Sequence, residues 1–97
     1  MGLPVILTPQ SQKDLQNIVA FIARDNPERA RSFGNELIDS ALSLTTLPER
    51  GRVTPELNDA NVREIVHSPY RIIYEVLSDK VYVLRFWHGA RGEVKKD

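Results

Sequence analysis

The stretch YRIIYEVLSDKVYVLRFWH, residues 70–88, decides the fold of this 97-residue chain. Apolar, β-branched and aromatic residues dominate both 70–78 and 80–88, and Asp79-Lys80 between them predicts a tight hairpin. Successive side chains of a strand point to opposite faces. Strict alternation in the second strand therefore puts Tyr82, Leu84, Phe86 and His88 on one face and Val83, Arg85 and Trp87 on the other. Neither face is cleanly polar, which predicts a sheet covered on one side and partly covered on the other.

Two helices are predicted upstream, and both begin with the same signal. Thr8-Pro9 and Asn26-Pro27 each place a capping side chain before a proline at the first helical position, where the missing N–H costs nothing. Apolar residues then recur every three or four positions, at Leu15, Ile18, Val19 and Ile22 and again at Ala30, Phe33, Leu37, Ala41 and Leu44. The short turn between the helices predicts an antiparallel helical hairpin, which ends at Leu47-Pro48.

The remaining segments complete a small α+β domain. Residues 3–7 predict an N-terminal strand, and residues 62–68 predict another, which Pro69 separates from the strand that follows. Residues 48–61 contain two prolines, a glycine and Asn/Asp pairs, as is typical of a loop. The order β-α-α-β-β-β predicts an α-helical hairpin packed on an antiparallel sheet, in a single domain over residues 1–97.

The net charge and its distribution along the chain bear on whether the protein binds nucleic acid. Thirteen basic and thirteen acidic side chains give a net charge of zero, whereas a strong nucleic-acid binder usually carries a basic excess. Residues 1–49 hold four basic and six acidic side chains, a net of −2, and residues 50–97 hold nine and seven, a net of +2. This mild asymmetry points any anionic ligand toward the C-terminal half.

Several kinds of chemistry lack the residues they need. The chain has no cysteine, which excludes disulfides and thiolate catalysis. His67 and His88 are the two histidines and have no ligand spacing, so we expect no metal and no cofactor. There is no apolar run of membrane-spanning length and no basic signal-peptide start, so we expect a cytoplasmic protein without a membrane partner. Residues 89–97 show no periodicity and predict a flexible tail.

Four short segments carry a resemblance to a known family. They are GRVTPEL (51–57), VREI (62–65), YRIIYEV (70–76) and VYVLRFWHGAR (81–91). In this order after a helical hairpin, and with the terminal H-x-x-R formed by His88 and Arg91, they resemble the RelE/ParE superfamily of bacterial toxins from type II toxin–antitoxin systems. The resemblance spans residues 5 to 91 and implies the fold predicted above. It also implies a cognate antitoxin protein that wraps and neutralises the toxin.

One branch of this superfamily, the RelE-like toxins, cleaves mRNA in the ribosome. The reaction needs a group that takes the ribose 2′-OH proton, positive charge at the scissile phosphate and a proton donor to the leaving oxygen. The resemblance assigns the phosphate-stabilising role to Arg71 and the acid or base role to His88. We expect Arg63, Arg85, Trp87 and Arg91 to contact a nucleic acid or another target.

The other branch, the ParE-like toxins, inhibits DNA gyrase through protein contacts, and three departures favour it. The loop before the middle strand has no lysine cluster; its charged residues are Glu49, Arg50, Arg52, Glu56 and Asp59. Gly89 rather than a tyrosine follows His88, and a net charge of zero is unusual for a protein that lodges among ribosomal phosphates. We therefore expect gyrase inhibition. The alternatives are RelE-like mRNA cleavage through Arg71 and His88, and a degenerate member that binds its antitoxin without toxicity.

Each candidate residue also has a structural interpretation. Arg71 could pair with Glu64 or Glu75 across the sheet, and His88 could simply end a strand. Arg85 also fits a solvated or antitoxin-facing position, and Trp87 fits packing or an interface. The stripe Leu15, Ile18, Val19 and Ile22 is either plain core or, as the resemblance implies, part of a surface over which an antitoxin segment lies.

Overall fold

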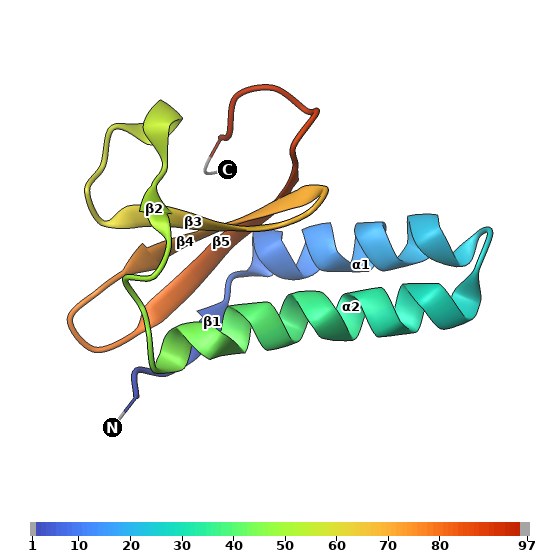
Figure 1. Cartoon of the computed structure of the whole chain (residues 1–97), viewed down its shortest axis with the longest axis horizontal. Coiled ribbons are helices and arrows are strands. Elements are labelled where there is room, and N and C mark those ends of the chain that lie inside the picture. The colour runs from blue at the N-terminus through green and yellow to red at the C-terminus, as the bar shows by residue number, and fades with distance from the viewer. Residues whose placement is uncertain (1, 96–97) are drawn as a thin grey trace.

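The computed structural model describes residues 2–95 as two helices laid on one face of a five-stranded sheet (Figure 1). The strands are β1 (Val5–Leu7), β2 (Arg52–Val53), β3 (Val62–His67), β4 (Tyr70–Val76) and β5 (Val81–His88), in the spatial order β1-β5-β4-β3-β2. The predicted α+β fold and element order are confirmed, and the predicted strand limits agree with the observed ones to within two residues. Two details were not anticipated: β1 pairs with β5 in parallel, and the short β2 lies inside the predicted loop.

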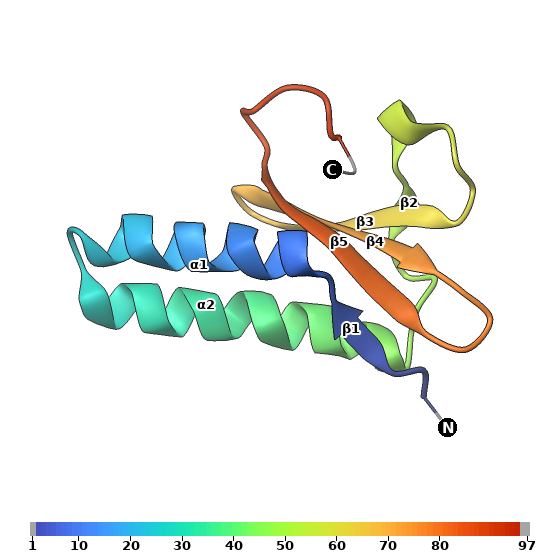
Figure 2. The ribbon, with the colours of Figure 1, turned by 180° about the vertical axis from the view of Figure 1, so that it is seen from behind.

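The helical hairpin consists of α1 (Pro9–Ala23) and α2 (Pro27–Leu42), and its caps are those that the sequence predicts. The side chains of Thr8 and Asn26 each accept a hydrogen bond from the backbone amide three residues further on. Figure 2 shows that the turn between the helices lies beyond the sheet, so the far end of the hairpin projects from it. Within residues 2–95, no helix is both long enough and apolar enough to cross a membrane.

The main core lies between this hairpin and the sheet. The apolar seam predicted for the second helix is buried at every position, namely Ala30, Phe33, Leu37 and Ala41 in α2 and Leu44 in the 3₁₀ turn that follows it. Its sheet-side partners are Ile72, Tyr74, Val81, Val83 and Phe86. The two helices approach closely at Gly34, where a Cβ atom would lie 2.9 Å from Val19 Cγ2. A larger residue at that position would push the helices apart.

A β-bulge in β5 makes the predicted alternation wrong at three residues. Ile73 pairs with Arg85 and Tyr74 pairs with Val83, so the strand holds one extra residue between these pairs. Val83 therefore joins Phe86 in the main core, while Tyr82 and Leu84 turn to the opposite face. Strict alternation cannot anticipate this shift because a bulge exchanges the two faces from that point onward.

A buried ion pair ties α1 to β5. β1 pairs with β5 only as far as Val83, so the edge of β5 beyond that residue has no neighbouring strand. Asp14 occupies this edge: its carboxylate accepts the Phe86 amide at 3.1 Å and binds the Arg85 guanidinium at 2.7 and 2.9 Å. The Asp14 and Arg85 side chains are only 7% and 5% exposed, and buried charges persist only when they are paired. The pair therefore fixes where α1 crosses the sheet.

The other face of the sheet is covered by two segments that are not strands. One is the loop around the short 3₁₀ turn η2 (Pro55–Leu57), and the other is the C-terminal segment 89–95 (Figures 1 and 2). Val94 is 3% exposed and packs with Val62, Ile73 and Trp87 in a second apolar cluster. The sequence-based expectation of a flexible tail over 89–97 gave no sign of these contacts, and its last two residues lie outside the described part of the chain.

Candidate functional site

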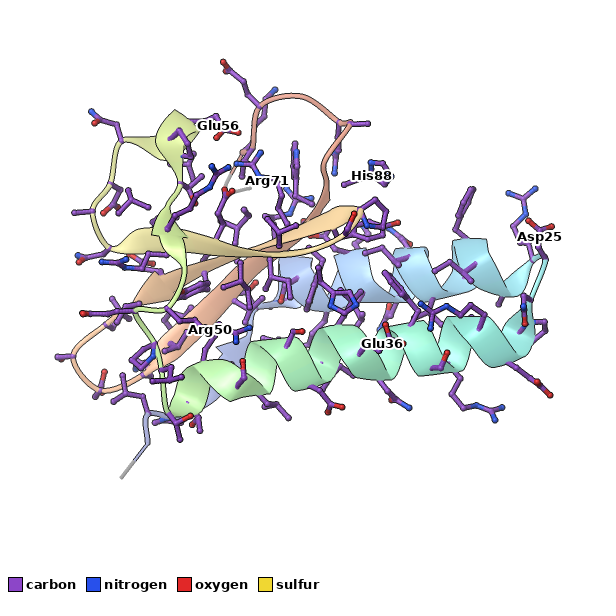
Figure 3. All side chains as sticks on the ribbon, viewed as in Figure 1. Asp25, Glu36, Arg50, Glu56, Arg71 and His88 are labelled. Carbon is purple, nitrogen blue, oxygen red and sulfur yellow. The ribbon has the colours of Figure 1, made fainter. Side chains whose placement is uncertain are left out.

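Arg71 lies in β4 on the face away from the helices, where two carboxylates bind it (Figure 3). Nη1 and Nη2 donate to the two Glu56 oxygens at 2.8 and 2.9 Å, and Nε and Nη2 donate to Glu64 Oε1 at 3.1 and 2.5 Å. The Arg71 side chain is 15% exposed and the Glu64 side chain is fully buried. Bidentate arginine–carboxylate pairs are the strongest of their kind. The two edges through which this guanidinium could bind an oxyanion are both occupied.

A second arginine extends the cluster to four charged residues, Arg52, Glu56, Glu64 and Arg71, which we call the Arg71 network. Arg52 donates to Glu64 Oε2 through Nε at 2.9 Å and through Nη2 at 2.8 Å. The network holds two positive and two negative charges, so it presents no net charge to a ligand. It joins β2, η2, β3 and β4 at one place.

The pKa values of the network follow from these contacts. Hydrogen bonds from Arg71 are the main reason that the pKa of Glu56 falls from 4.5 to about 2, and the Val94 amide, 3.1 Å from Glu56 Oε2, adds to the effect. Glu56 and Glu64 in turn raise the pKa of Arg71 above its usual value. These hydrogen bonds favour the ionised forms of Glu56 and Arg71, which therefore form an ion pair at neutral pH.

The sequence predicted part of this network. The interpretation that Arg71 pairs with Glu64 across the sheet is confirmed, whereas Glu75, four residues further along β4, stands across from Val62 in β3 and Tyr82 in β5. Glu56 was missed because it comes from a loop 15 positions away in the sequence, where no periodic signal fixes a side chain's direction. The one sequence signal for this contact is the position of Glu56, directly after Pro55 and shortly before the predicted strands.

His88, at the end of β5, points to the opposite face of the sheet from Arg71. It stands across from Tyr70, and their rings meet edge to face at a centroid distance of 5.1 Å, whereas Arg71 stands across from Trp87. His88 Nδ1 accepts the Ala90 amide at 3.0 Å, so the neutral ring carries its proton on Nε2. The two residues expected to share one scissile phosphate are therefore not brought together.

The other expected target contacts are mostly engaged inside the protein. Arg63 donates to the Gly51 carbonyl at 2.8 Å and so holds the loop before β2. Arg85 is bound to Asp14 as described above, and Trp87 is 3% exposed with its indole N–H 3.1 Å from the Gly92 carbonyl. Arg91 differs from these because it is exposed, with its guanidinium 4.1 Å from the centre of the Trp87 ring system.

The second histidine, His67, belongs to a separate polar cluster on the helix side. Its Nε2 lies 3.0 Å from Glu36, which also binds Arg29 at 2.7 Å. This cluster ties the end of β3 to α2. In the part of the chain that the structure describes, no three His, Cys, Asp or Glu side chains gather closely enough to hold a metal ion.

Residues 5–92 match the family described as the ParE toxin of the type II toxin–antitoxin system parDE. The chain belongs to this family. A curated relative, Toxin RelE1 of Caulobacter vibrioides, is 32% identical over 91 residues, which make up 92% of this chain and 96% of the relative.

Solved structures share the fold of this ParE-family chain at lower identity. A chain of the chromosomal ParDE system of P. aeruginosa superposes with a TM-score of 0.76 at 18% identity, covering 89% of this chain and 95% of that one. A chain of the toxin–antitoxin complex RelBE2 of Mycobacterium tuberculosis gives 0.67 at 20% identity, covering 91% and 99%. The predicted membership of the RelE/ParE superfamily is confirmed, and the chain is a toxin of the type II class.

In this ParE-family toxin the predicted apolar stripe of α1 faces inward. Ile18 is buried, and Leu15, Val19 and Ile22 are partly buried. α1 also exposes a large apolar residue, Phe21, with 65% of its surface accessible, which sequence reasoning missed because it lies beside the stripe.

Phe21 borders an open groove of about 680 Å³ between the helical hairpin and the β3–β4 turn. The groove is mainly apolar and aromatic, and its lining includes Phe21, Ile22, Phe33, Pro69, Tyr70 and His88, with Arg29 at the rim. A concave surface of this kind suits the apolar side chains of another protein segment better than it suits a phosphate.

The charge of Glu56 should make stability depend on pH. Because folding lowers the pKa of Glu56 from 4.5 to about 2, the ionised carboxylate stabilises the folded state above pH 4.5, and this contribution is lost as the pH falls toward 2. We expect Glu56→Gln to lower the free energy of unfolding by about 1–2 kcal/mol near neutral pH. The difference between wild type and variant should shrink below pH 4.5. Urea unfolding of both proteins at several pH values measures this difference.

Glu93→Gln is the matched control for this experiment, because Glu93 is an exposed carboxylate in the C-terminal segment. Its effect should be small at every pH. A Glu56→Gln deficit that stays constant between pH 7 and pH 2 would show that the carboxylate charge is not what stabilises the fold.

Proposed function

We propose that this type II toxin acts through protein contacts with DNA gyrase, without RNA cleavage, and that a cognate antitoxin neutralises it. The observation that carries the proposal is the Arg71 network. The arginine that an mRNA-cleaving relative would direct at the scissile phosphate is held here by Glu56 and Glu64. Such a toxin needs no cofactor, and its target places it in the cytoplasm.

The arrangement of charge supports the same proposal. Phosphodiester cleavage requires an acid, a base and a cation within hydrogen-bond reach of one phosphate. Arg71 and His88 point to opposite faces of the sheet, and Arg85 is neutralised by Asp14. A net charge of zero also makes it unfavourable to lodge among ribosomal phosphates.

The proposed gyrase contact includes the C-terminal rim, where Arg91 is exposed on the Trp87 ring. Deleting residues 89–97 is a poor probe of this surface because it also removes Val94 from the second apolar cluster. Arg91→Ala changes the exposed charge and leaves the Val94 packing in place. It is therefore the variant of choice for locating the contact.

The deciding experiment uses one preparation of antitoxin-free protein in two assays. A gyrase supercoiling assay should show inhibition, and a cell-free translation reaction should show intact mRNA when its 5′ ends are mapped. Arg91→Ala should weaken the gyrase inhibition by about fivefold or more, as expected for a rim charge that contributes on the order of 1 kcal/mol.

Two other results would contradict the proposal. New 5′ ends within codons that disappear in His88→Ala would establish an endoribonuclease. Normal supercoiling together with intact mRNA, from protein that still binds its antitoxin, would establish a degenerate member without toxicity.

We further propose that the antitoxin places an apolar segment in the groove beside Phe21. Leu15, Ile18 and Val19 of the α1 stripe are turned toward the core, whereas Ile22 lines the groove beside accessible aromatic groups. Binding in a hydrophobic groove is a common way for one protein to capture a helix or peptide of another. Arg29 at the rim favours an acidic residue next to the apolar ones.

Phe21→Glu should weaken antitoxin binding without unfolding the toxin. Phe21 is exposed, so the substitution removes no core contact, but it places a charge where an apolar partner would lie. We expect a loss of affinity of about thirtyfold or more, measured by calorimetry with the cognate antitoxin. Leu42→Glu is the control, because Leu42 is 51% exposed at the other end of the hairpin. Equal losses for the two variants would contradict a site at the groove.

A further inference from the structure

We propose that residues 89–95 form a strap that opens as a unit from an otherwise folded protein, and that Glu56 is the latch that holds it closed. The strap lies across the face of the sheet that the helices leave free (Figure 1). Opening it would expose part of that face. The proposal concerns this toxin's own fold and stands whether or not gyrase is the target.

The strap is attached mainly through side chains. At its start the Gly89 amide donates to the Pro69 carbonyl at 2.8 Å. Beyond that point the Arg91 amide donates to the His88 carbonyl at 3.0 Å, and side chains supply the other contacts of the strap with the rest of the protein. Trp87 Nε1 donates to the Gly92 carbonyl at 3.1 Å, Arg85 donates to the Lys95 carbonyl at 3.3 Å, and the Val94 amide donates to Glu56 at 3.1 Å. Among residues 2–95, no backbone ladder links 90–95 to a strand. Such a segment can leave without breaking the sheet.

The strap also contributes little apolar burial. Val94 is its one buried residue, and it belongs to the small second cluster rather than to the main core under the helices. Regions with few buried apolar contacts open at lower free energy than the whole domain unfolds. The main core, with α2 and the inner face of β4 and β5, is untouched by this opening.

The backbone of the strap contains a glycine where a bend is needed. Gly92 has φ of +95°, a conformation that side-chain-bearing residues rarely adopt, and no atom lies near the position of its missing Cβ. Gly89 stands at the other end of the same turn, directly after β5. Two glycines three positions apart give the segment freedom to swing.

Glu56 is the latch because one of its carboxylate oxygens binds both the strap and the sheet. Oε2 accepts the Val94 amide at 3.1 Å and the Arg71 guanidinium at 2.8 Å. The carboxylate thus fixes the strap to the sheet through an ion pair whose other end is anchored by the buried Glu64. Removing this carboxylate takes away the strap's link to the Arg71 network and leaves the Arg52–Glu64–Arg71 part in place.

One aromatic ring and two arginines lie on the face that the closed strap covers, and each of these side chains is mostly buried. Trp87 is 3% and Arg85 4% exposed, and the Arg71 side chain is 15% exposed. Opening therefore exposes the Trp87 ring, while Arg71 stays paired with Glu56 and Glu64 and Arg85 stays paired with Asp14. This makes the strap a device that controls access to the second face of the toxin.

Hydrogen exchange followed by NMR tests this directly on the full chain. The Val94 amide and the Trp87 indole N–H report on the strap, and Trp87 is the only tryptophan. The ladder amides between β4 and β5 report on global unfolding. In wild type, added urea should speed exchange of the ladder amides strongly and that of the two strap protons much less, because local opening exposes little surface.

Glu56→Ala should speed exchange of both strap protons by about tenfold or more, with a smaller change at the ladder amides. Glu93→Ala, which removes an exposed carboxylate of the strap itself, should leave both rates unchanged. Acrylamide quenching of Trp87 fluorescence should increase in Glu56→Ala and not in Glu93→Ala.

The proposal is overturned if strap and ladder protons of the wild type share one urea dependence, because the strap then opens only when the domain unfolds. It is also overturned if Glu56→Ala accelerates strap and ladder exchange equally. The wild-type urea series decides the matter even if Glu56→Ala does not fold.

Discussion

The pairing of Arg71 with Glu56 and Glu64 is the constraint on which the second face of this toxin depends. Glu64 is fully buried, and a buried carboxylate is tolerated only while cations and donors surround it. Arg52 and Arg71 meet that need from two neighbouring strands, and Glu56 balances the remaining positive charge. The short β2, the loop with η2 and the C-terminal strap are all positioned by this network. Arg71, to which a RelE-like interpretation of the family resemblance assigns the phosphate-stabilising role, is here bound by Glu56 and Glu64.

The two faces of the sheet are covered by different parts of the protein. The helix side carries the main core, and there Asp14 replaces a missing strand at the edge of β5 and locks α1 in position. The second side carries the Arg71 network and the strap. Exposed groups suited to other proteins lie at the margins of both: Phe21 beside the groove and Arg91 on the C-terminal rim. This division is consistent with a toxin that works and is neutralised through surface contacts with other proteins.

The elements of this fold are largely predictable from local sequence, because local physics determines them. Thr8 and Asn26 cap the helices, the α2 seam is spaced for burial, and Asp79-Lys80 turns the hairpin. What escapes prediction depends on distant partners. The bulge at Leu84 arises from the pairing of β5 with β4, and it changes which face of the sheet the neighbouring side chains point to. Val94 is an apolar residue in a polar tail, and the cluster that buries it forms only when the chain folds. The candidate site was anticipated only as far as its residue types, since Arg71 and His88 could be named but their opposite directions could not.

The central claim is that Arg71 is structural, and a rescue experiment tests it most directly. Arg71→Met leaves Glu56 without its ion-pair partner, whereas Arg71→Met/Glu56→Gln removes one charge of each sign and leaves the Arg52–Glu64 pair balanced. The measurement is growth arrest on induced expression of each variant without antitoxin, compared at equal amounts of folded protein. The account predicts that the double variant arrests growth as wild type does and is more stable than the single variant. A double variant that folds and leaves growth unaffected would contradict it, since a catalytic arginine cannot be rescued by removing its carboxylate partner.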